Sequence, residues 1–270
     1  MLLLTWNILH GGGATRMPRI TLTLLDEQPD VIALTEFRST VGGQIAGVLA
    51  DHGYTHTLST DLSRTRNGIF MASRWPMERS MHAGPGDLWS GRWLEATVPH
   101  LNLRIATVHV PDDTRPSDKA AYWQFLIDYG RRYRHARAVV CGDFNTGRRF
   151  SDASSDTGFG RFGCERLLGA FCSIGFRDAF RLKHPESREF SWFSPWGQGL
   201  RIDGAYVSKP LHTRVESASY GHEARRSGIS DHAPFLLRLS LPPQKGVENP
   251  SIRRPSEKIA AFSDVFDPLV

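Results

Sequence analysis

Short apolar segments alternate with longer segments of helical spacing along the chain. Runs rich in β-branched residues, such as LLLTW at 2–6 and VIALT at 31–35, are typical of buried strands. The same pattern predicts strands at 68–73, 92–98, 103–110, 138–142, 189–193, 201–208 and 234–241. It predicts helices at 20–28, 43–52, 118–133 and 163–174, and a Gly/Ser/Asp loop at 151–160. So many short strands with few helices between them favour an α/β (α+β) fold of two packed mixed β-sheets flanked by helices.

The composition changes after Leu241. Residues 242–258 read PPQKGVENPSIRRPSEK, which is Pro-rich and polar and is typical of a linker. A short acidic and apolar segment, IAAFSDVFDPLV, follows it. We therefore expect one domain over residues 1–241 and a linker with a C-terminal tail over 242–270. The tail either frays or packs on the domain, or it docks a protein partner.

Charge and cysteine content narrow the environment and the partner. The 270 residues carry a net charge of +5 and have a pI of about 9.3, which favours a polyanionic partner such as DNA. The N-terminal MLLLTWN is too short an apolar run for a membrane span or a signal segment, and we expect a cytoplasmic protein without a span. The three cysteines form no metal-spaced pair and indicate reduced thiols.

Polar side chains recur where the predicted strands begin or end. They are Asn7, Glu36, His109, Asp143, Asn145, Asp203, Asp231 and His232. Taken singly, an Asp or Asn in such a place is most often a turn former. Taken together, they would emerge at one rim of a sheet, where a site can be built on rigid supports.

The residue types in this set indicate a hard cation. Oxygen ligands with two histidines and no Cys/His cluster suit Mg²⁺ or Mn²⁺ and not structural zinc. The motifs HExxH, GxxxxGK[ST] and GxSxG are absent, which removes zinc proteases, P-loop NTPases and common serine hydrolases.

The order of the motifs resembles a known family. The segments are LLLTWN, QPDVIALTEFR, NGIFMASRWP, RIATVHVP, VVCGDFNTG, FSWFSPWGQGLRIDGAYVS and SGISDHAPF. Over residues 1–241 they resemble the endonuclease/exonuclease/phosphatase superfamily, and within it the exonuclease III and abasic-site endonuclease branch. The resemblance implies a four-layer α/β sandwich and a Mg²⁺-dependent phosphodiester hydrolase.

By this resemblance, Glu36 is the primary metal carboxylate, with Asn7 beside it as a ligand or a close neighbour of the ligands. Asp143 is similar to the family residue that orients or deprotonates the attacking water. Asn145 would hold that water or a phosphate oxygen.

The SDH segment contributes two further roles. Asp203 would bond His232 and fix its tautomer, and His232 would contact the scissile phosphate. Because adjacent side chains of an extended chain point to opposite faces, Asp231 would face away from His232 and serve as a metal ligand.

Three positions leave alternatives open. His109 occupies a place where abasic endonucleases carry Tyr and where DNase I-like and lipid-cleaving members carry His; it would contact phosphate or act as a general acid. Asn67 either bonds His109 or forms a turn. Trp192, with Phe193 and Leu200, forms either an apolar substrate pocket or part of the core.

Two arginine pairs flank the motifs. Arg148 and Arg149 follow GDFN, and Arg225 and Arg226 precede SGISDH. We expect both pairs to lie near the site and to contact backbone phosphates.

Three functions follow in order of preference. The first is a DNA nuclease with exonuclease or abasic-site activity. The second is a phosphodiesterase or phosphatase acting on a lipid, an inositol phosphate or a small nucleotide. The third is a non-catalytic binding module, which the competent residue type at each matched position disfavours.

Overall fold

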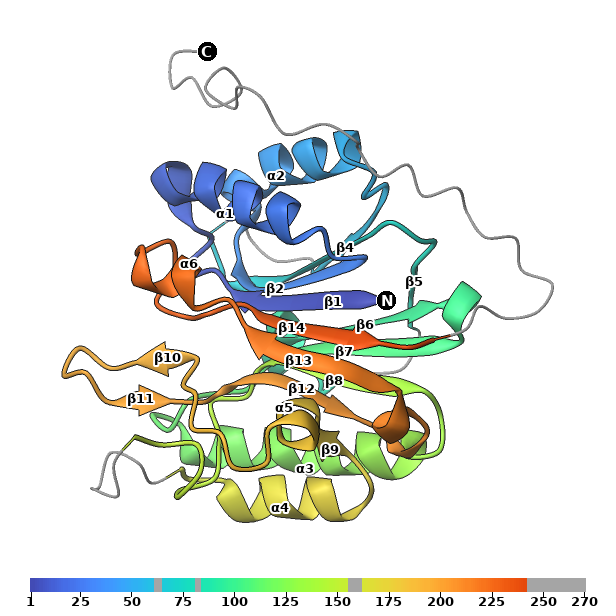
Figure 1. Ribbon diagram of the computed structural model, residues 1–270, viewed down its shortest axis with the longest axis vertical. Helices are drawn as coiled ribbons and strands as arrows, with labels where there is room; N and C mark the ends of the chain where they lie inside the picture. The colour runs from blue at the N-terminus through green and yellow to red at the C-terminus, as the bar shows by residue number, and fades with distance from the viewer. Residues whose placement is uncertain (61–64, 81–83, 155–161, 242–270) are drawn as a thin grey trace.

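Two six-stranded β-sheets packed face to face form the centre of the protein in a computed structural model (Figure 1). The structure describes residues 1–60, 65–80, 84–154 and 162–241. The expected linker and tail at 242–270, and residues 155–160 of the expected loop, lie outside the described residues.

The first sheet has the strand order β13-β14-β1-β2-β4-β3. Its strands are β1 (Leu2–Asn7), β2 (Val31–Phe37), β3 (His56–Ser59), β4 (Gly68–Ser73), β13 (Val215–Tyr220) and β14 (Phe235–Leu239). Strands β1 and β2 run parallel, and every other neighbouring pair is antiparallel. The carboxyl ends of β1 and β2 therefore meet at one rim.

The second sheet has the order β5-β6-β7-β8-β12-β9. Its strands are β5 (Glu78–Arg79), β6 (Trp93–Val98), β7 (Leu103–His109), β8 (Ala138–Asp143), β9 (Arg177–Asp178) and β12 (Asp203–Val207). Here β7 and β8 form the parallel pair, while β12 runs antiparallel to β8. The end of β8 thus lies beside the start of β12.

Helices cover the outer face of each sheet. Helices α1 (Gly13–Glu27) and α2 (Ser39–Asp51) pack on the first sheet, and α3 (Pro116–Tyr133) and α4 (Glu165–Ser173) pack on the second (Figure 1). A third apolar core lies between the sheets and includes Leu3, Ile69, Ile105, Val139 and Leu237. The expected four-layer sandwich is confirmed.

Short elements complete the chain. They are the helices α5 (Ala179–Lys183) and α6 (His222–Arg226), the 3-10 helices η1 (Asp87–Arg92), η2 (Pro99–Leu101) and η4 (Lys209–Arg214), and the hairpin β10 (Trp192–Phe193) and β11 (Gly199–Leu200). This hairpin projects from the side of the sandwich (Figure 1).

Several expected elements have different boundaries in the structure. The helix expected at 20–28 spans Gly13–Glu27, and Pro18 lies inside it, where the proline lacks the amide proton of one helical hydrogen bond. The strand expected at 189–193 is reduced to Trp192–Phe193, because its partner β11 is only two residues long.

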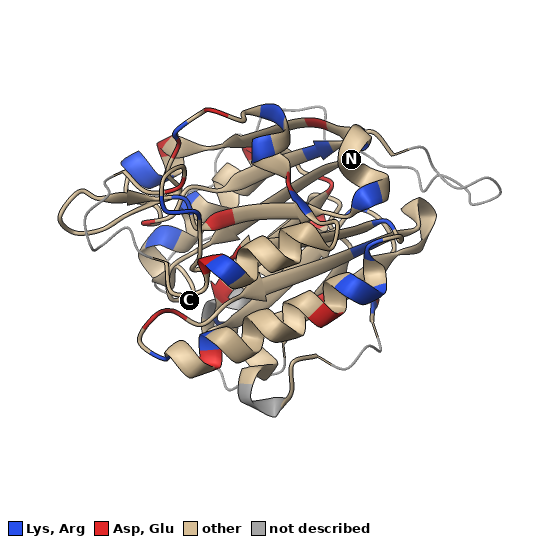
Figure 2. Cartoon of the chain, turned by 90° about the horizontal axis from the view of Figure 1, so that it is seen from below, with Lys and Arg blue, Asp and Glu red and all other residues tan. Residues whose placement is uncertain are grey.

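Charged residues of both signs are spread over helices and loops in the view of Figure 2, and the basic ones form no single stripe there. None of the helices described is both long and apolar enough to cross a membrane. All three cysteines are free thiols.

Candidate active site

The predicted polar residues converge on one rim of the sandwich because of strand direction. Asn7 ends β1 and Glu36 lies near the end of the parallel strand β2. In the second sheet, Asp143 at the end of β8 pairs in register with His109 of β7 on one side and Asp203 of β12 on the other. Residues from both sheets thus meet within hydrogen-bonding distance.

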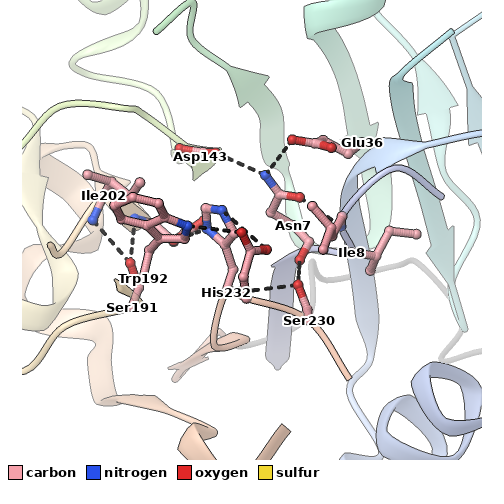
Figure 3. A network of polar contacts seen from close by, with 12 residues as sticks. Asn7, Ile8, Glu36, Asp143, Ser191, Trp192, Ile202, Ser230 and His232 are labelled. Carbon is pink, nitrogen blue, oxygen red and sulfur yellow. Dashed lines mark hydrogen bonds and ion pairs between the residues drawn. The ribbon is translucent and has the colours of Figure 1, made fainter. Parts of the chain in front are cut away.

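Asn7 links the two sheets (Figure 3). Its Nδ2 donates to Glu36 Oε1 at 3.2 Å and to Asp143 Oδ2 at 3.0 Å. Its Oδ1 accepts from the backbone amide of Leu9 at 3.0 Å. With the amide in this orientation, Asn7 positions two carboxylates, and its own oxygen faces its loop.

Backbone irregularity aims Glu36 at the rim. Glu36 has a φ of 56°, and the register of β2 against β4 shifts between Thr35 and Phe37, which marks a β-bulge. Burial raises the pKa of Glu36, but the electrostatic interaction with the nearby His109 ring and hydrogen bonds from His10 and Asn7 outweigh it and hold the pKa below its usual value. Glu36 is therefore a carboxylate at neutral pH.

Asp143 is the most perturbed carboxyl group at the rim. Burial and then the negative charge of Asp203 raise the pKa of Asp143 to about 7. Its Oδ1 accepts from the amide of Asn145 at 2.9 Å. Asn145 has a φ of 46°, and its Nδ2 donates to the Val110 carbonyl at 2.9 Å, which holds the turn after β8.

Asp203 and His232 form a buried pair. His232 Nδ1 lies 2.8 Å from Asp203 Oδ2, so Nε2 is the ring nitrogen left for other contacts. Burial alone would lower the pKa of His232, but the charge and hydrogen bond of Asp203 outweigh it and raise that pKa to about 10. Ser191 Oγ supports the pair by accepting from the Asp203 amide at 3.1 Å.

The expected direction of Asp231 is wrong. Its Oδ1 lies 3.9 Å from His232 Nε2, so the two side chains lie on the same side. Alternation applies only within strands, and β14 does not begin until Phe235. The other oxygen, Oδ2, accepts from Trp192 Nε1 at 3.0 Å. These contacts place Asp231 beside His232, with Oδ1 buried and lacking a hydrogen-bond partner among the described residues.

His109 lies between the two acidic groups as a neutral imidazole. Its Nε2 is 4.0 Å from Glu36 Oε1 and 3.9 Å from Asp143 Oδ2. Burial and then the charge of Arg92 lower the pKa of His109 to about 3.

Asn67 does not make the hydrogen bond to His109 that one sequence interpretation gave it. Among the described residues, its Nδ2 donates to Glu36 Oε2 at 2.9 Å, and its Oδ1 accepts from Arg38 Nε at 2.7 Å. Asn67 therefore holds the second oxygen of Glu36.

A cavity of about 680 Å³ opens at these residues. Its lining comprises Glu36, His109, Asp112, Asp113, Thr114, Asp143, Asn145, Phe162, Trp192, Leu200, Ile202 and His232. Trp192 and Leu200 thus face the cavity, as one of the two interpretations held. Sequence reasoning missed the segment from Asp112 to Thr114, although it follows β7 closely, as Asn145 follows β8.

Lys119 was also missed because a helical lysine is normally a surface residue. Its side chain is fully buried, and Nζ donates to Asp113 Oδ1 at 2.8 Å and to the Asn145 carbonyl at 2.5 Å. Lys119 therefore ties α3 to the two loops that line the cavity.

The arginine pairs do not line this cavity. Arg148 lies in a separate cavity of about 370 Å³, where Nη2 contacts Cys172 Sγ at 3.7 Å. Arg149 lies over the Phe150 ring at 5.3 Å, Arg225 lies over the Phe193 ring at 4.2 Å, and Arg226 is exposed. The expected position of Arg148 is wrong because the chain turns back after Asn145 toward α4.

The chemistry of the donor set fits a hard divalent cation. Asp143, Asp203 and His232 present ligand atoms within 4.8 Å of one another, but a protonated His232 has no lone pair to offer. Glu36 and Asp143 instead present carboxylate oxygens to the same cavity. Burial and then the negative charge of Asp203 raise the pKa of Asp143, and a cation bound beside it would favour its carboxylate form.

Comparisons with known proteins identify the family and the fold. Residues 4–232 match the sequence profile of the endonuclease/exonuclease/phosphatase family. An AP endonuclease structure from Archaeoglobus fulgidus is similar, with 21% identity, a TM-score of 0.77, and coverage of 89% of this chain and 100% of that one.

Two Neisseria structures are equally similar in fold. The 3′-5′ exonuclease NExo from Neisseria meningitidis aligns with 24% identity and a TM-score of 0.75, covering 89% of this chain and 100% of that one. A structure described as the 3′ phosphatase NExo bound to product DNA hairpin has the same identity and TM-score, with coverage of 89% and 99%. A search of curated proteins gave no significant match.

Proposed function

Because the chain belongs to the endonuclease/exonuclease/phosphatase family, we propose that it is a metal-dependent phosphodiester hydrolase that cleaves DNA as an exonuclease III-like endo/exonuclease. The family itself supports the coarser statement that the chain is a phosphoester hydrolase. The nuclease activity, the metal requirement and the DNA substrate are the parts that we add.

One observation carries the proposal. Four side chains in different protonation states line one cavity. Glu36 is a carboxylate, and Asp143 is a carboxyl group with a pKa of about 7. His232 is an oriented imidazolium, and His109 is a neutral imidazole. Phosphodiester hydrolysis requires a base for water, positive charge at the phosphoryl oxygens and help for the leaving alkoxide. The cavity provides a group for each requirement.

The roles follow from the protonation states. Asp143, with a pKa near neutrality, is suited to accept a proton from the attacking water. His232, held through Nδ1 by Asp203, directs its Nε2 proton at a phosphoryl oxygen. His109 is neutral and can contact a phosphate oxygen or exchange a proton with the leaving group.

The cation would be held by Glu36, with Asp143 opposite and Asn7 fixing both carboxylates. When bound, Mg²⁺ or Mn²⁺ supplies charge neutralisation for the phosphate.

DNA is the substrate that the comparisons favour. The similar structures are described as an AP endonuclease, a 3′-5′ exonuclease and a 3′ phosphatase with a DNA hairpin. The net charge of +5 is consistent with a polyanionic substrate.

His109 supports a second candidate function. Because the family carries His at this position in DNase I-like and lipid-cleaving members, a phosphodiesterase or phosphatase acting on a lipid, an inositol phosphate or a small nucleotide is the alternative.

A substrate panel tests the proposal. The protein is incubated with plasmid DNA, blunt and 3′-recessed duplexes, an abasic oligonucleotide and a bis-aryl phosphodiester, each with Mg²⁺ or EDTA. We expect Mg²⁺-dependent DNA cleavage that falls by about 100-fold or more in Asp143→Asn and His232→Ala.

The matched control is Asp128→Asn, which removes an exposed carboxylate of α3 and should cleave DNA as the parent protein does. Cleavage of the small diester or of lipid without any cleavage of DNA would reject the DNA substrate and favour the alternative.

A further inference from the structure

A second cavity lies beside the catalytic one. It has a volume of about 350 Å³, and its lining comprises Arg66, Trp89, Arg92, Pro111, Asp112, Thr114, Arg115 and Asp118. Asp112 and Thr114 also line the catalytic cavity, so the loop after β7 separates two adjoining spaces.

Three guanidinium groups reach this cavity from three different segments. Arg66 precedes β4, Arg92 ends η1, and Arg115 immediately precedes α3. Within the described chain, none of the three forms an ion pair of 4.0 Å or less. Arg92 Nη1 donates to the His109 carbonyl at 3.2 Å, which ties this cavity to the catalytic rim.

The acidic residues of the cavity leave an excess of positive charge. Three arginines face two aspartates there, Asp112 and Asp118. The Asp112 carboxylate is turned into its own loop, where Oδ1 accepts from the Thr114 amide at 3.0 Å and from the Thr114 hydroxyl. Asp118 lies in the first turn of α3, where the helix dipole favours a carboxylate.

The wall of the cavity is rigid on one side. The Trp89 ring packs edge-on against Tyr122 of α3, with ring centroids 5.7 Å apart. Tyr122 in turn donates from its hydroxyl to the Arg92 carbonyl at 2.5 Å. The guanidinium of Arg92 therefore extends from a fixed backbone.

We propose that this second cavity, termed here the flanking-phosphate subsite, binds a phosphate of the substrate strand next to the one that is cleaved. The proposal rests on the proposed function. Guanidinium groups match the geometry of phosphate oxygens and remain charged at all physiological pH values. A strand whose scissile phosphate lies at His232 and Asp143 carries its next phosphate into an adjoining space, and this subsite adjoins the catalytic cavity.

The subsite would give the enzyme a preference for polymers. A small diester fills only the catalytic cavity, whereas an oligonucleotide gains a second charged contact. Such a contact positions the strand without reading its sequence.

Neutral linkages test the proposal directly. Each oligonucleotide of a set carries a single methylphosphonate, and its position near the scissile bond differs from one oligonucleotide to the next. The kcat and KM are measured for each oligonucleotide. We expect one flanking position to cost the parent protein about tenfold in kcat/KM, mainly through KM.

The double variant Arg66→Gln/Arg115→Gln should lose about tenfold in kcat/KM on the natural oligonucleotide and lose nothing further from that methylphosphonate. Each single variant should show part of the effect. Both side chains are exposed, so the fold should be retained.

The matched control is Arg131→Gln/Arg132→Gln, which removes the same charge at the other end of α3, about 24 Å along the helix from Arg115. It should keep the full sensitivity to the methylphosphonate. If the neutral linkage costs the parent and the Arg66/Arg115 variant equally, the subsite is rejected. If the parent cleaves no natural oligonucleotide at all, the proposed function itself fails.

Discussion

Asp203 and Asp143 face each other across neighbouring strands, and their different hydrogen-bond partners suit them to different roles. Asp203 is committed to His232 through a 2.8 Å contact, whereas Asp143 receives hydrogen bonds from an amide side chain and a backbone amide. Burial and the charge of Asp203 then raise the pKa of Asp143 to about 7. One acid orients a histidine, and the other is left able to exchange a proton.

The Asp203→Asn variant separates these roles. Without the carboxylate, the pKa of His232 should fall from about 10, because burial then acts with less opposition. The pKa of Asp143 should also fall, since a neighbouring negative charge is removed. We expect kcat to fall by about 100- to 10,000-fold, with both pKa shifts measured by NMR titration; an unchanged His232 pKa would contradict the assignment.

Sequence could identify residues whose position follows from a strand end. Asn7, Glu36, Asp143 and Asp203 adjoin long apolar runs, so the rim was predictable. Asp231 was misplaced because the alternation rule was applied outside a strand. Lys119 and the loop from Asp112 to Thr114 were missed because their importance depends on how α3 packs, which local sequence does not express.

At the scale of elements, the end of β8 is held by close approach of two backbones. Gly142 has a φ of 133°, and a Cβ built there would lie 2.0 Å from the Val108 carbonyl oxygen of β7. Only glycine fits such a place beside Asp143.

The Gly142→Ala variant should therefore be destabilised by about 2 to 4 kcal/mol, measured by urea denaturation. DNA cleavage should fall with it, because β7 and β8 carry His109 and Asp143. The control is Gly169→Ala in α4, where a Cβ meets nothing within 4 Å and the change should be neutral or stabilising by up to about 1 kcal/mol. Equal stability of the two variants would refute the backbone explanation.

A buried ion network supports the start of β12 from outside the cavity. Arg201 Nη2 lies 2.8 Å from Asp152 Oδ1 and 2.6 Å from Asp178 Oδ2, and Arg181 also reaches Asp152 at 2.5 Å. Burial raises the pKa of Asp152, but Arg201 and Arg181 outweigh it and hold this pKa below its usual value.

Stability should follow the charge of Asp152. A lowered folded-state pKa contributes stability above the unfolded value, about 3.9, and the contribution is lost as pH falls through the folded value. Asp152→Asn should cost about 3 kcal/mol at pH 7, and the difference from the parent should shrink toward pH 3 in urea denaturation. If the difference in unfolding free energy between Asp152→Asn and the parent grows as pH falls, the assigned role of the Asp152 charge is contradicted.

Elements differ in how far their sequence specifies them. Strands with four apolar residues, such as β1 and β8, were predictable because burial on both faces leaves a mostly apolar run. β5, β9 and β3 are two to four residues long and polar, and they form because a neighbouring strand offers its edge. No local sequence pattern predicts these three strands.

At the scale of the whole molecule, both sheets contribute to the proposed cation position. Glu36 comes from the first sheet and Asp143 from the second, and Asn7 bridges them. A ligand that binds both should stabilise the sandwich as a unit.

We expect Mg²⁺ at about 100 times its Kd to add about 2.7 kcal/mol and to raise Tm by about 5 to 10 °C relative to EDTA, as measured by calorimetry. Glu36→Gln should remove this shift. A Tm that is insensitive to Mg²⁺ in the parent protein would mean that the folded chain binds no cation, and a shift that Glu36→Gln keeps would place the cation elsewhere.

The bond from Ser230 Oγ to the Asn7 carbonyl, 2.7 Å long, joins residues 223 positions apart. His232 likewise accepts from Trp6 through its carbonyl. The contacts between β1 and the segment that carries His232 therefore form only when this late part of the chain is available. During synthesis on the ribosome, the proposed active site is therefore incomplete until residue 232 has emerged, and we expect an unfinished chain to lack the proposed activity.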